Sequence, residues 1–423
     1  MTPVELAPRF FIAVATILLF CKAVAWLLGK VGQPAVVSEM LAGVLLGPSL
    51  LGLLLPDVQD AIFPQPLYPI LYVVGQVGLV IFMFQAGYAF SQHRVTGLAG
   101  TAGAVSLAGV TAPLALGVLL VVLTNGHAPV LVDGVPLGVS AAFVGVALAI
   151  TAFPMLARII TERGQAGTRH GSLALASGAL DDVVAWIMLA FVLAVASGRT
   201  GPALVTLGGA LLFVVIIWYG VRPAAAVLMG ERPLSGQARL LGTVALLFGI
   251  AWYTDEIGLY AVFGAFAVGA VMPHNERTDG VVGLLTPVCQ IVFLPLFFTY
   301  SGLRTEFGLL GEPAVLLFAV GCIVVAIAGK FGACWTAARL RGEPNAVALR
   351  VGALMNARGL MQLIALNVGL EAGIVGPPLF TALVLVALVT TLMTTPLLSW
   401  IERRERGRAE PARREQAVSA GLI

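Results

Sequence analysis

The stretch LALASGALDDVVAWI, residues 173–187, places Asp181 and Asp182 side by side in the middle of a long apolar run. Apolar residues continue on both sides of the pair, and a helix needs roughly 20 such residues to cross a hydrocarbon core about 30 Å thick. Ionisable side chains are costly inside a membrane and usually mark a path for ions or protons. The stretch therefore predicts a membrane-spanning helix with two functional carboxylates at its centre.

Composition indicates that the rest of the chain has the same character. Of its 423 residues, 59% are hydrophobic and 11% are charged, whereas a soluble domain has about 25% charged residues. The sequence shows no basic patch that would bind nucleic acid, no cofactor loop, and no cysteine spacing typical of disulfides or metal sites. We therefore expect an all-α polytopic membrane protein that is surrounded by lipid, binds no nucleic acid, needs no cofactor and is not an enzyme.

About thirteen apolar stretches are long enough to span a membrane. With the N-terminus outside and the C-terminus in the cytoplasm, nearly all lysines and arginines of the connecting segments lie inside, and Arg9, Arg199 and Arg304 are left outside. Cytoplasmic loops of membrane proteins show this bias. We expect a multi-pass plasma-membrane protein whose residues 402–423 form a short, charged cytoplasmic tail. The expected spans are residues 10–29, 35–55, 67–90, 95–124, 136–160, 171–197, 202–221, 238–254, 258–273, 281–302, 313–338, 347–370 and 377–401.

Away from the ends of the predicted spans, the basic residues are Lys330 and Arg358, whereas Lys22 lies near the cytoplasmic end of its span. Adjacent positions on an α-helix differ by about 100° around its axis, so Asp181 and Asp182 cannot both face the same partner. A buried lysine must be paired or neutral. We expect Lys330 to pair with one aspartate while the other faces a water-filled cavity. The structural alternative is that two acids and two bases merely balance one another and hold the helices together.

The adjacent carboxylates favour a particular chemistry. Two carboxylates in a low dielectric repel each other when both are ionised, so each binds a proton more readily. Such a carboxylate can hold a proton or a bare alkali cation, but hardly both. This competition is the simplest basis for exchanging protons for a monovalent cation.

Two of the predicted spans are interrupted. One contains Thr151-Ala-Phe-Pro154, where proline removes a backbone hydrogen bond, and the other contains Asn356 and Arg358 in apolar surroundings. Broken helices at corresponding positions of two halves indicate a transporter site near the midplane, where free carbonyls and helix ends can bind a cation. We expect Arg358 to balance the helix dipoles. Thr151 and Asn356 are candidate ligands, and hydrogen bonding to their own helices is the structural alternative.

Several motifs in a fixed order make the chain resemble the monovalent cation:proton antiporter superfamily, in particular its two-aspartate branch and the cation/proton exchangers of bacteria and plants. The resemblance covers nearly the whole chain. It rests on Gln33–Ser49 (QPAVVSEMLAGVLLGPS), Thr151–Pro154 (TAFP), Asp181-Asp182, Gly264–Gly269 (GAFAVG), Phe297–Leu303 (FFTYSGL), Gly329-Lys330, Met355–Gly359 (MNARG) and Asn367–Leu370 (NVGL).

The resemblance implies roles for individual residues. Asp182 would be the principal cation and proton site, and Asp181 would be the partner of Lys330. Thr151 would lie beside the ion path. The implied ligands of Na⁺ or K⁺ are therefore Asp182, Asp181 and Thr151.

The resemblance also implies a fold of two inverted repeats with crossed discontinuous helices, here within a transmembrane domain of residues 1–401. A scaffold of about residues 1–90 and 238–302 would form a homodimer. A core of about residues 95–197 and 313–401 would slide against it in an elevator-like movement.

The function expected from these patterns is electrogenic exchange of Na⁺ or K⁺ for protons, of the kind that serves pH homeostasis. Gln362 stands where these exchangers usually have a glutamate, and Gln85 begins an unusual QAGYA in the third span. These two departures would permit an alternative, a proton-coupled exporter of a cation-bound organic ion. A gated cation channel without coupling is a further alternative, although no repeated pore ring is visible in the sequence.

Overall fold

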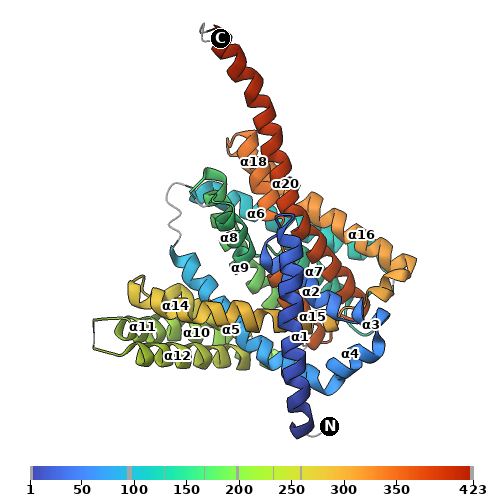
Figure 1. Cartoon of the computed structure of the whole chain (residues 1–423), viewed down its shortest axis with the longest axis vertical. Helices are drawn as coiled ribbons and strands as arrows, with labels where there is room; N and C mark the ends of the chain where they lie inside the picture. The colour runs from blue at the N-terminus through green and yellow to red at the C-terminus, as the bar shows by residue number, and fades with distance from the viewer. Residues whose placement is uncertain are drawn as a thin grey trace.

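The computed structural model describes residues 3–92, 98–127, 129–165, 167–196, 200–231, 233–257 and 260–419, and these residues form helices without a β-sheet (Figure 1). The helices of the first half are α1 Pro3–Gly29, α2 Ala35–Leu46, α3 Leu51–Leu54, α4 Pro56–Ile62, η1 Gln65–Leu67, α5 Tyr68–Gln92, α6 Ala99–Thr124, α7 Leu137–Ala149, α8 Phe153–Glu162, α9 Arg169–Ala196, α10 Thr200–Val215 and η2 Ile216–Val221. Those of the second half are α11 Arg222–Leu228, α12 Gly236–Glu256, α13 Ala261–Val271, α14 Glu276–Val288, η3 Cys289–Phe293, α15 Leu294–Leu303, η4 Phe307–Gly311, α16 Pro313–Ile327, η5 Ala328–Gly332, α17 Ala333–Leu340, α18 Asn345–Met355, α19 Leu360–Glu371 and α20 Pro377–Ser419.

The described part of the chain contains nine helical stretches that are long and apolar enough to cross a membrane, with the shorter apolar helices α7, α13 and α18 in addition. The prediction of an all-α polytopic membrane protein is confirmed. The count of about thirteen spans stays a prediction, because several predicted spans are not single long helices. Residues 136–160 and 347–370, in particular, each fold as two short helices.

The two interrupted spans break where the sequence predicts, and their breaks touch. Residues 150–152 separate α7 from α8, and residues 356–359 separate α18 from α19. The backbone N–H of Ala152 in the first break donates a 3.1 Å hydrogen bond to the carbonyl of Ala357 in the second. Gly359 ends the second break at φ +54°, a backbone conformation that glycine adopts without steric cost.

Two hydrophobic clusters hold the helices together. The smaller cluster joins α1, α2, the start of α5 and α15, and the larger one includes most of the other helices. Within the larger cluster, α9 packs against α6, α7, α8 and α18, which brings it beside both breaks. Figure 1 shows α10, α11, α12 and α14 gathered on one side and α16 and α18 away from them. The assignment of scaffold and core groups stays a prediction.

The last helix is longer than predicted. α20 continues past residue 401, the predicted end of the last span, as far as Ser419, and the cytoplasmic tail stays a prediction. Figure 1 shows its end projecting beyond the other helices. Extending an existing helix needs no new nucleus, and the Glu, Arg and Ala residues of this segment are good helix formers.

Candidate functional site

The two aspartates lie in the middle of α9 and are both buried. Asp181 is 0% exposed and Asp182 is 3% exposed. Close packing of α8 against α9 is possible here because residue 178 is a glycine. A Cβ on Gly178 would lie 2.6 Å from a methyl carbon of Leu156 on α8.

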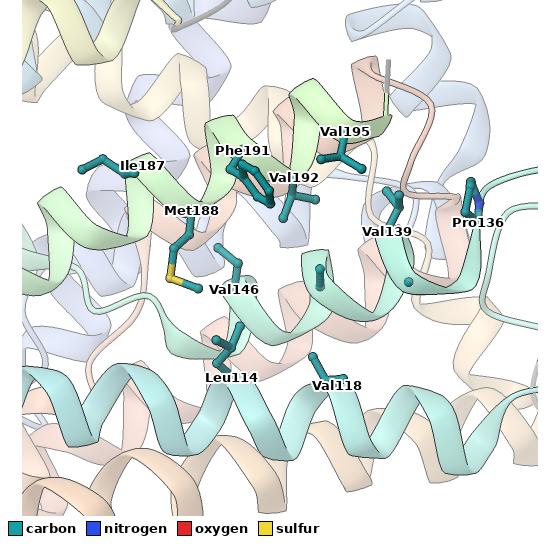
Figure 2. Close-up of a pocket in the computed structure, with 12 residues that line it drawn as sticks. Leu114, Val118, Pro136, Val139, Val146, Ile187, Met188, Phe191, Val192 and Val195 are labelled. Carbon is teal, nitrogen blue, oxygen red and sulfur yellow. The ribbon is translucent and has the colours of Figure 1, made fainter. Parts of the chain in front are cut away.

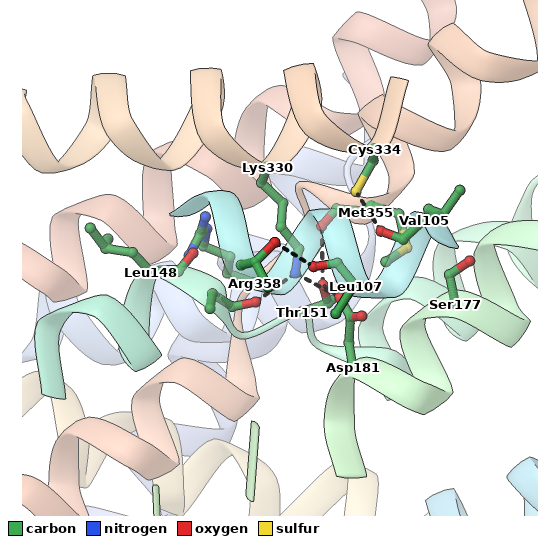
Figure 3. Close-up of polar contacts among 12 residues, drawn as sticks. Val105, Leu107, Leu148, Thr151, Ser177, Asp181, Lys330, Cys334, Met355 and Arg358 are labelled. Carbon is green, nitrogen blue, oxygen red and sulfur yellow. Dashed lines mark hydrogen bonds and ion pairs between the residues drawn. The ribbon is translucent and has the colours of Figure 1, made fainter. Parts of the chain in front are cut away.

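Lys330 forms the predicted ion pair with Asp181. Its Nζ lies 2.6 Å from Oδ2 of Asp181, and both side chains are fully buried. The same ammonium donates a 2.5 Å hydrogen bond to the carbonyl of Ala149, the last residue of α7. The hydroxyl of Thr151 donates to the same oxygen of Asp181 at 2.8 Å, and Figure 3 shows the three side chains pointing toward one another. One oxygen of Asp181 therefore accepts from two donors.

The helix that carries Lys330 is locally widened. Residues 328–332 form the π-helical turn η5 between α16 and α17, and such turns are frequent at functional sites. Gly109 on α6 allows the close approach of Cys334 on α17, because a Cβ there would lie 2.6 Å from Sγ of Cys334, while it would be in ordinary contact with Lys330, 3.7 Å from Nζ. Sequence reasoning missed Gly109. The run of small residues at 99–109 is the signal that could have indicated it.

Asp182 has different surroundings from Asp181. Among the described residues, neither of its carboxylate oxygens has a hydrogen-bond partner of ordinary geometry. It interacts with the backbone N–H of Phe153 at the start of α8, and a helix N-terminus carries a partial positive charge that stabilises an anion. The exposed side chains of this part of α9 include Leu180 and Val183, at 42% and 37%. They lie roughly 160° and 100° around the helix axis from Asp182, so Asp182 points away from the exposed face of α9.

Arg358 is fully buried and has no carboxylate partner within the described ranges. Its guanidinium donates to the carbonyls of Ala147 and Leu148 in the last turn of α7 and to that of Ala326 on α16. The C-terminal end of a helix carries a partial negative charge, and Arg358 and Lys330 together neutralise it on α7. The structural alternative requires each buried base to balance a buried acid. Lys330 does so with Asp181, whereas Arg358 bonds to backbone carbonyls instead.

Polar side chains in and near the two breaks make further contacts. The amide of Asn356 donates to Sδ of Met393 at 3.7 Å, while its Oδ1 is buried without a hydrogen-bond partner in the described part of the chain. Gln362 donates to the carbonyl of Leu383 at 3.1 Å. Thr151 also approaches the carbonyl of Met355, at 3.3 Å. No hydrogen bond in the described residues joins Asn356 to either aspartate.

The donor atoms at the site suit a hard monovalent cation better than a transition metal. No group of three or more His, Cys, Asp or Glu side chains with metal-binding geometry occurs in the residues that the structure describes. Buried oxygens without hydrogen-bond partners do occur there, on Asp182, Asp181 and Asn356. Carboxylate and amide oxygens are the ligands that hard cations prefer.

Comparison with known proteins places the chain in context. A family model described as "Sodium/hydrogen exchanger, transmembrane" matches residues 15–401. The chain is 36% identical over 386 residues to the Na(+)/H(+) antiporter NhaS4 of Synechocystis sp., with 89% of this chain and 93% of that protein covered. It is 33% identical over 426 residues to Cation/H(+) antiporter 18 of Arabidopsis thaliana, covering 96% of this chain but 50% of the plant protein.

A solved structure shares the fold. The sodium proton antiporter MjNhaP1 from Methanocaldococcus jannaschii superimposes with a TM-score of 0.62 over 93% of this chain and 97% of that chain, at 15% sequence identity. At this identity the match concerns the arrangement of helices and not the site chemistry.

Proposed function

The chain belongs to the sodium/hydrogen exchanger family, and we propose that it exchanges protons for a monovalent cation, Na⁺ or K⁺, across the membrane. The names of its relatives support this assignment, because NhaS4 is called a Na(+)/H(+) antiporter and the plant relative a Cation/H(+) antiporter. The chain spans about half the length of that plant relative. The proposal therefore concerns ion exchange by the membrane-spanning domain alone.

The observation that carries the proposal is the contrast between the two aspartates. Asp181 is neutralised by Lys330, whereas Asp182 is buried without an ion-pair partner among the described residues and interacts with the backbone N–H of Phe153. A buried carboxylate without a counter-ion is unfavourable, so Asp182 is stable when it binds either a proton or a cation. One group that binds both in turn, on either side of the membrane, couples their movements.

The mechanism follows from this competition. A proton on Asp182 neutralises the site in one orientation, and its release on the other side leaves a carboxylate that takes up the cation. We propose that the Asp181–Lys330 pair releases a second proton when the cation binds. Two protons then cross for each cation, and the exchange moves one net charge per cycle.

We further propose the large-scale arrangement that the family resemblance implies. Residues 95–197 and 313–401 would move as a core against a dimeric scaffold of residues 1–90 and 238–302, in a plasma membrane, with the N-terminus outside. The crossed breaks lie within that core, so a rigid movement of the core would carry the ion site from one side to the other.

The test is exchange in proteoliposomes loaded with a pH-sensitive dye. Addition of Na⁺, K⁺ or Li⁺ to wild-type vesicles should move protons with a preference for one cation. Asp182→Asn should abolish cation-dependent proton movement while leaving purification and assembly unchanged. The matched control is Asp133→Asn, which changes an exposed aspartate in the turn before α7 and should leave exchange at the wild-type rate. Near-normal exchange by Asp182→Asn would exclude Asp182 as the shared site, and cation flux without proton movement would indicate a channel.

A further inference from the structure

A purely apolar cavity of about 690 Å³ lies between α6, α7 and α9, outside the aspartate site (Figure 2). Its walls include Leu114 and Val118 of α6, Val146 of α7, and Met188 and Phe191 of α9. Figure 2 shows Met188 and Val192 of α9 directed toward Val146 across the cavity. Volumes of 300–1,000 Å³ are typical of sites for small molecules.

The cavity is a groove that opens to the side. Its floor is buried, with Val139, Val146 and Val192 between 1% and 6% exposed. Its rim on α9 is exposed, with Phe191 at 69% and Ile187 at 59%. The chain is a multi-pass membrane protein, and the exposed rim of the groove is apolar, so its open side is suited to contact with the hydrocarbon of the bilayer.

The groove extends from one membrane surface toward the midplane. One end is at Pro136 and Val195, where α7 begins and α9 ends. The other end is at Val146 and Met188, within two turns of the first break and of Asp182. From Gly138 to Val146 the helix rises about 12 Å at 1.5 Å per residue. One leaflet contributes about 15 Å of the hydrocarbon thickness, so the groove has the length of a single leaflet.

We propose that this groove binds one acyl chain of a membrane phospholipid from the leaflet at which α7 begins. The walls contain no charged or hydrogen-bonding side chain, which disfavours a hydrated ion, a polar headgroup or an organic cation. A second copy of the protein would need a protruding side chain to enter the groove and would cover its rim. The hydrocarbon of the surrounding leaflet matches the groove in chemistry, length and direction, and it is present at high concentration beside the opening.

An acyl chain in the groove would contact the two helices that build the ion site. Val146 directly precedes Ala147, whose carbonyl accepts from Arg358, and Met188 lies on the same helix as Asp182. The bound chain would hold α7 and α9 in their present spacing. The binding proposal does not depend on ion exchange and can fail or succeed independently of it.

The test uses a phospholipid with a photoreactive diazirine at the middle of one acyl chain. The purified full-length chain is reconstituted in phosphatidylcholine vesicles that contain this lipid, irradiated, digested and analysed by mass spectrometry. Peptides from the groove walls on α7 and α9 should be labelled about tenfold more than peptides from the exposed face of α10 at Leu211, the factor that 1.4 kcal/mol of binding free energy produces. Equal labelling of the groove and of α10, or cross-links between two copies at the groove, would overturn the proposal.

A filling variant supplies the specific control. Gly138→Phe adds a ring at the groove wall, at a position where an added Cβ meets nothing within 4 Å. It should reduce labelling of the groove to the level of α10. Gly103→Phe on α6 also starts from open space but does not line the groove, and it should leave labelling unchanged. Persistent groove labelling in Gly138→Phe would contradict the site. Should that variant not purify as a folded protein, Phe191→Ala removes a mostly exposed part of the wall and should also lower groove labelling, whereas unchanged labelling would count against the site.

Discussion

The first helix break, residues 150–152, and the second, residues 356–359, are joined by a backbone hydrogen bond but are stabilised differently. The carbonyls that end α7 at the first break accept from Lys330 and Arg358, so two full positive charges face them. At the second break, the carbonyl of Met355 is approached by the neutral hydroxyl of Thr151. Both breaks interrupt a helix in the same way, but only the carbonyls at the first break are faced by positively charged side chains.

This difference indicates where a transported cation can bind. A helix end that already holds two cationic side chains repels an alkali cation. The second break offers neutral oxygens instead, because Oδ1 of Asn356 is buried without a hydrogen-bond partner in the described part of the chain and the Met355 carbonyl is adjacent. We therefore expect residues of the second break to affect the affinity for the transported cation. Lys330 and Arg358, whose positive charges face the first break, should affect the stability of the fold and the net charge moved per cycle.

The largest effect is expected from removing the positive charge of Arg358, whose side chain extends from the second break to the carbonyls at the end of α7. Arg358→Gln leaves the carbonyls of Ala147, Leu148 and Ala326 without their charged donor. A hydrogen bond to a charged group contributes about 1.5–3 kcal/mol, so the variant should lose about 3 kcal/mol of stability and its exchange activity. Thermal unfolding followed with a thiol-reactive dye measures this, because Cys21, Cys289, Cys322 and Cys334 are all buried.

Two variants control for the charge itself. Arg341→Gln removes an arginine from an exposed turn after α17 and should unfold at the wild-type temperature. Arg358→Lys keeps the charge but lacks the planar fork that reaches several carbonyls, so it should be intermediate. An Arg358→Gln variant as stable as wild type would show that the charge asymmetry of the two breaks is incidental.

Neutralising Lys330, the other positively charged side chain at the first break, tests how much net charge moves in each exchange cycle. Lys330→Gln removes one titrating group and leaves Asp182. Exchange should fall on the order of tenfold, which corresponds to about 1.4 kcal/mol, and should lose its dependence on membrane potential. Each net charge moved corresponds to about 2.3 kcal/mol per 100 mV, so currents on solid-supported membranes distinguish the two forms. Robust exchange without a current in the wild type would rule out the two-proton mechanism and leave Lys330 as a structural counter-ion.

A smaller effect is expected at the second break. Asn356→Ala removes the unpartnered Oδ1 without touching the ion pair. The cation concentration for half-maximal exchange should rise about tenfold, while the maximal rate stays within a few-fold. Asn345→Ala is the matched control, because this asparagine lies at the other end of α18 and accepts from Trp335 near the surface. An unchanged cation affinity in Asn356→Ala would remove the second break from the cation site.

Several of these features could be predicted from the sequence. Apolar runs, Pro154 and the polar centre at Asn356 are local signals, and they were sufficient to predict the membrane class and both breaks. The pairing of Lys330 also followed, because a buried ammonium needs an anion. The residue types alone could not show which aspartate pairs with Lys330. They also could not show that Arg358 would donate to carbonyls at a helix end, because backbone acceptors carry no sequence signal. The groove beside α7 arises from how three apolar helices fail to fill the space between them, and composition does not reveal such a gap.

The smallest expected effect concerns the hydroxyl that touches both breaks. Thr151 donates to Asp181 at 2.8 Å and approaches the carbonyl of Met355 at 3.3 Å. Thr151→Val keeps the shape and removes this donor, which should cost about 1 kcal/mol and slow exchange roughly fivefold, with Thr151→Ser restoring most of the rate. Thr394→Val is the matched control, because that buried hydroxyl donates back to its own helix at Thr390, and its loss should leave exchange unchanged. Equal rates for Thr151→Val and Thr394→Val would mean that the contact of Thr151 with Asp181 orders the fold without affecting the ion site.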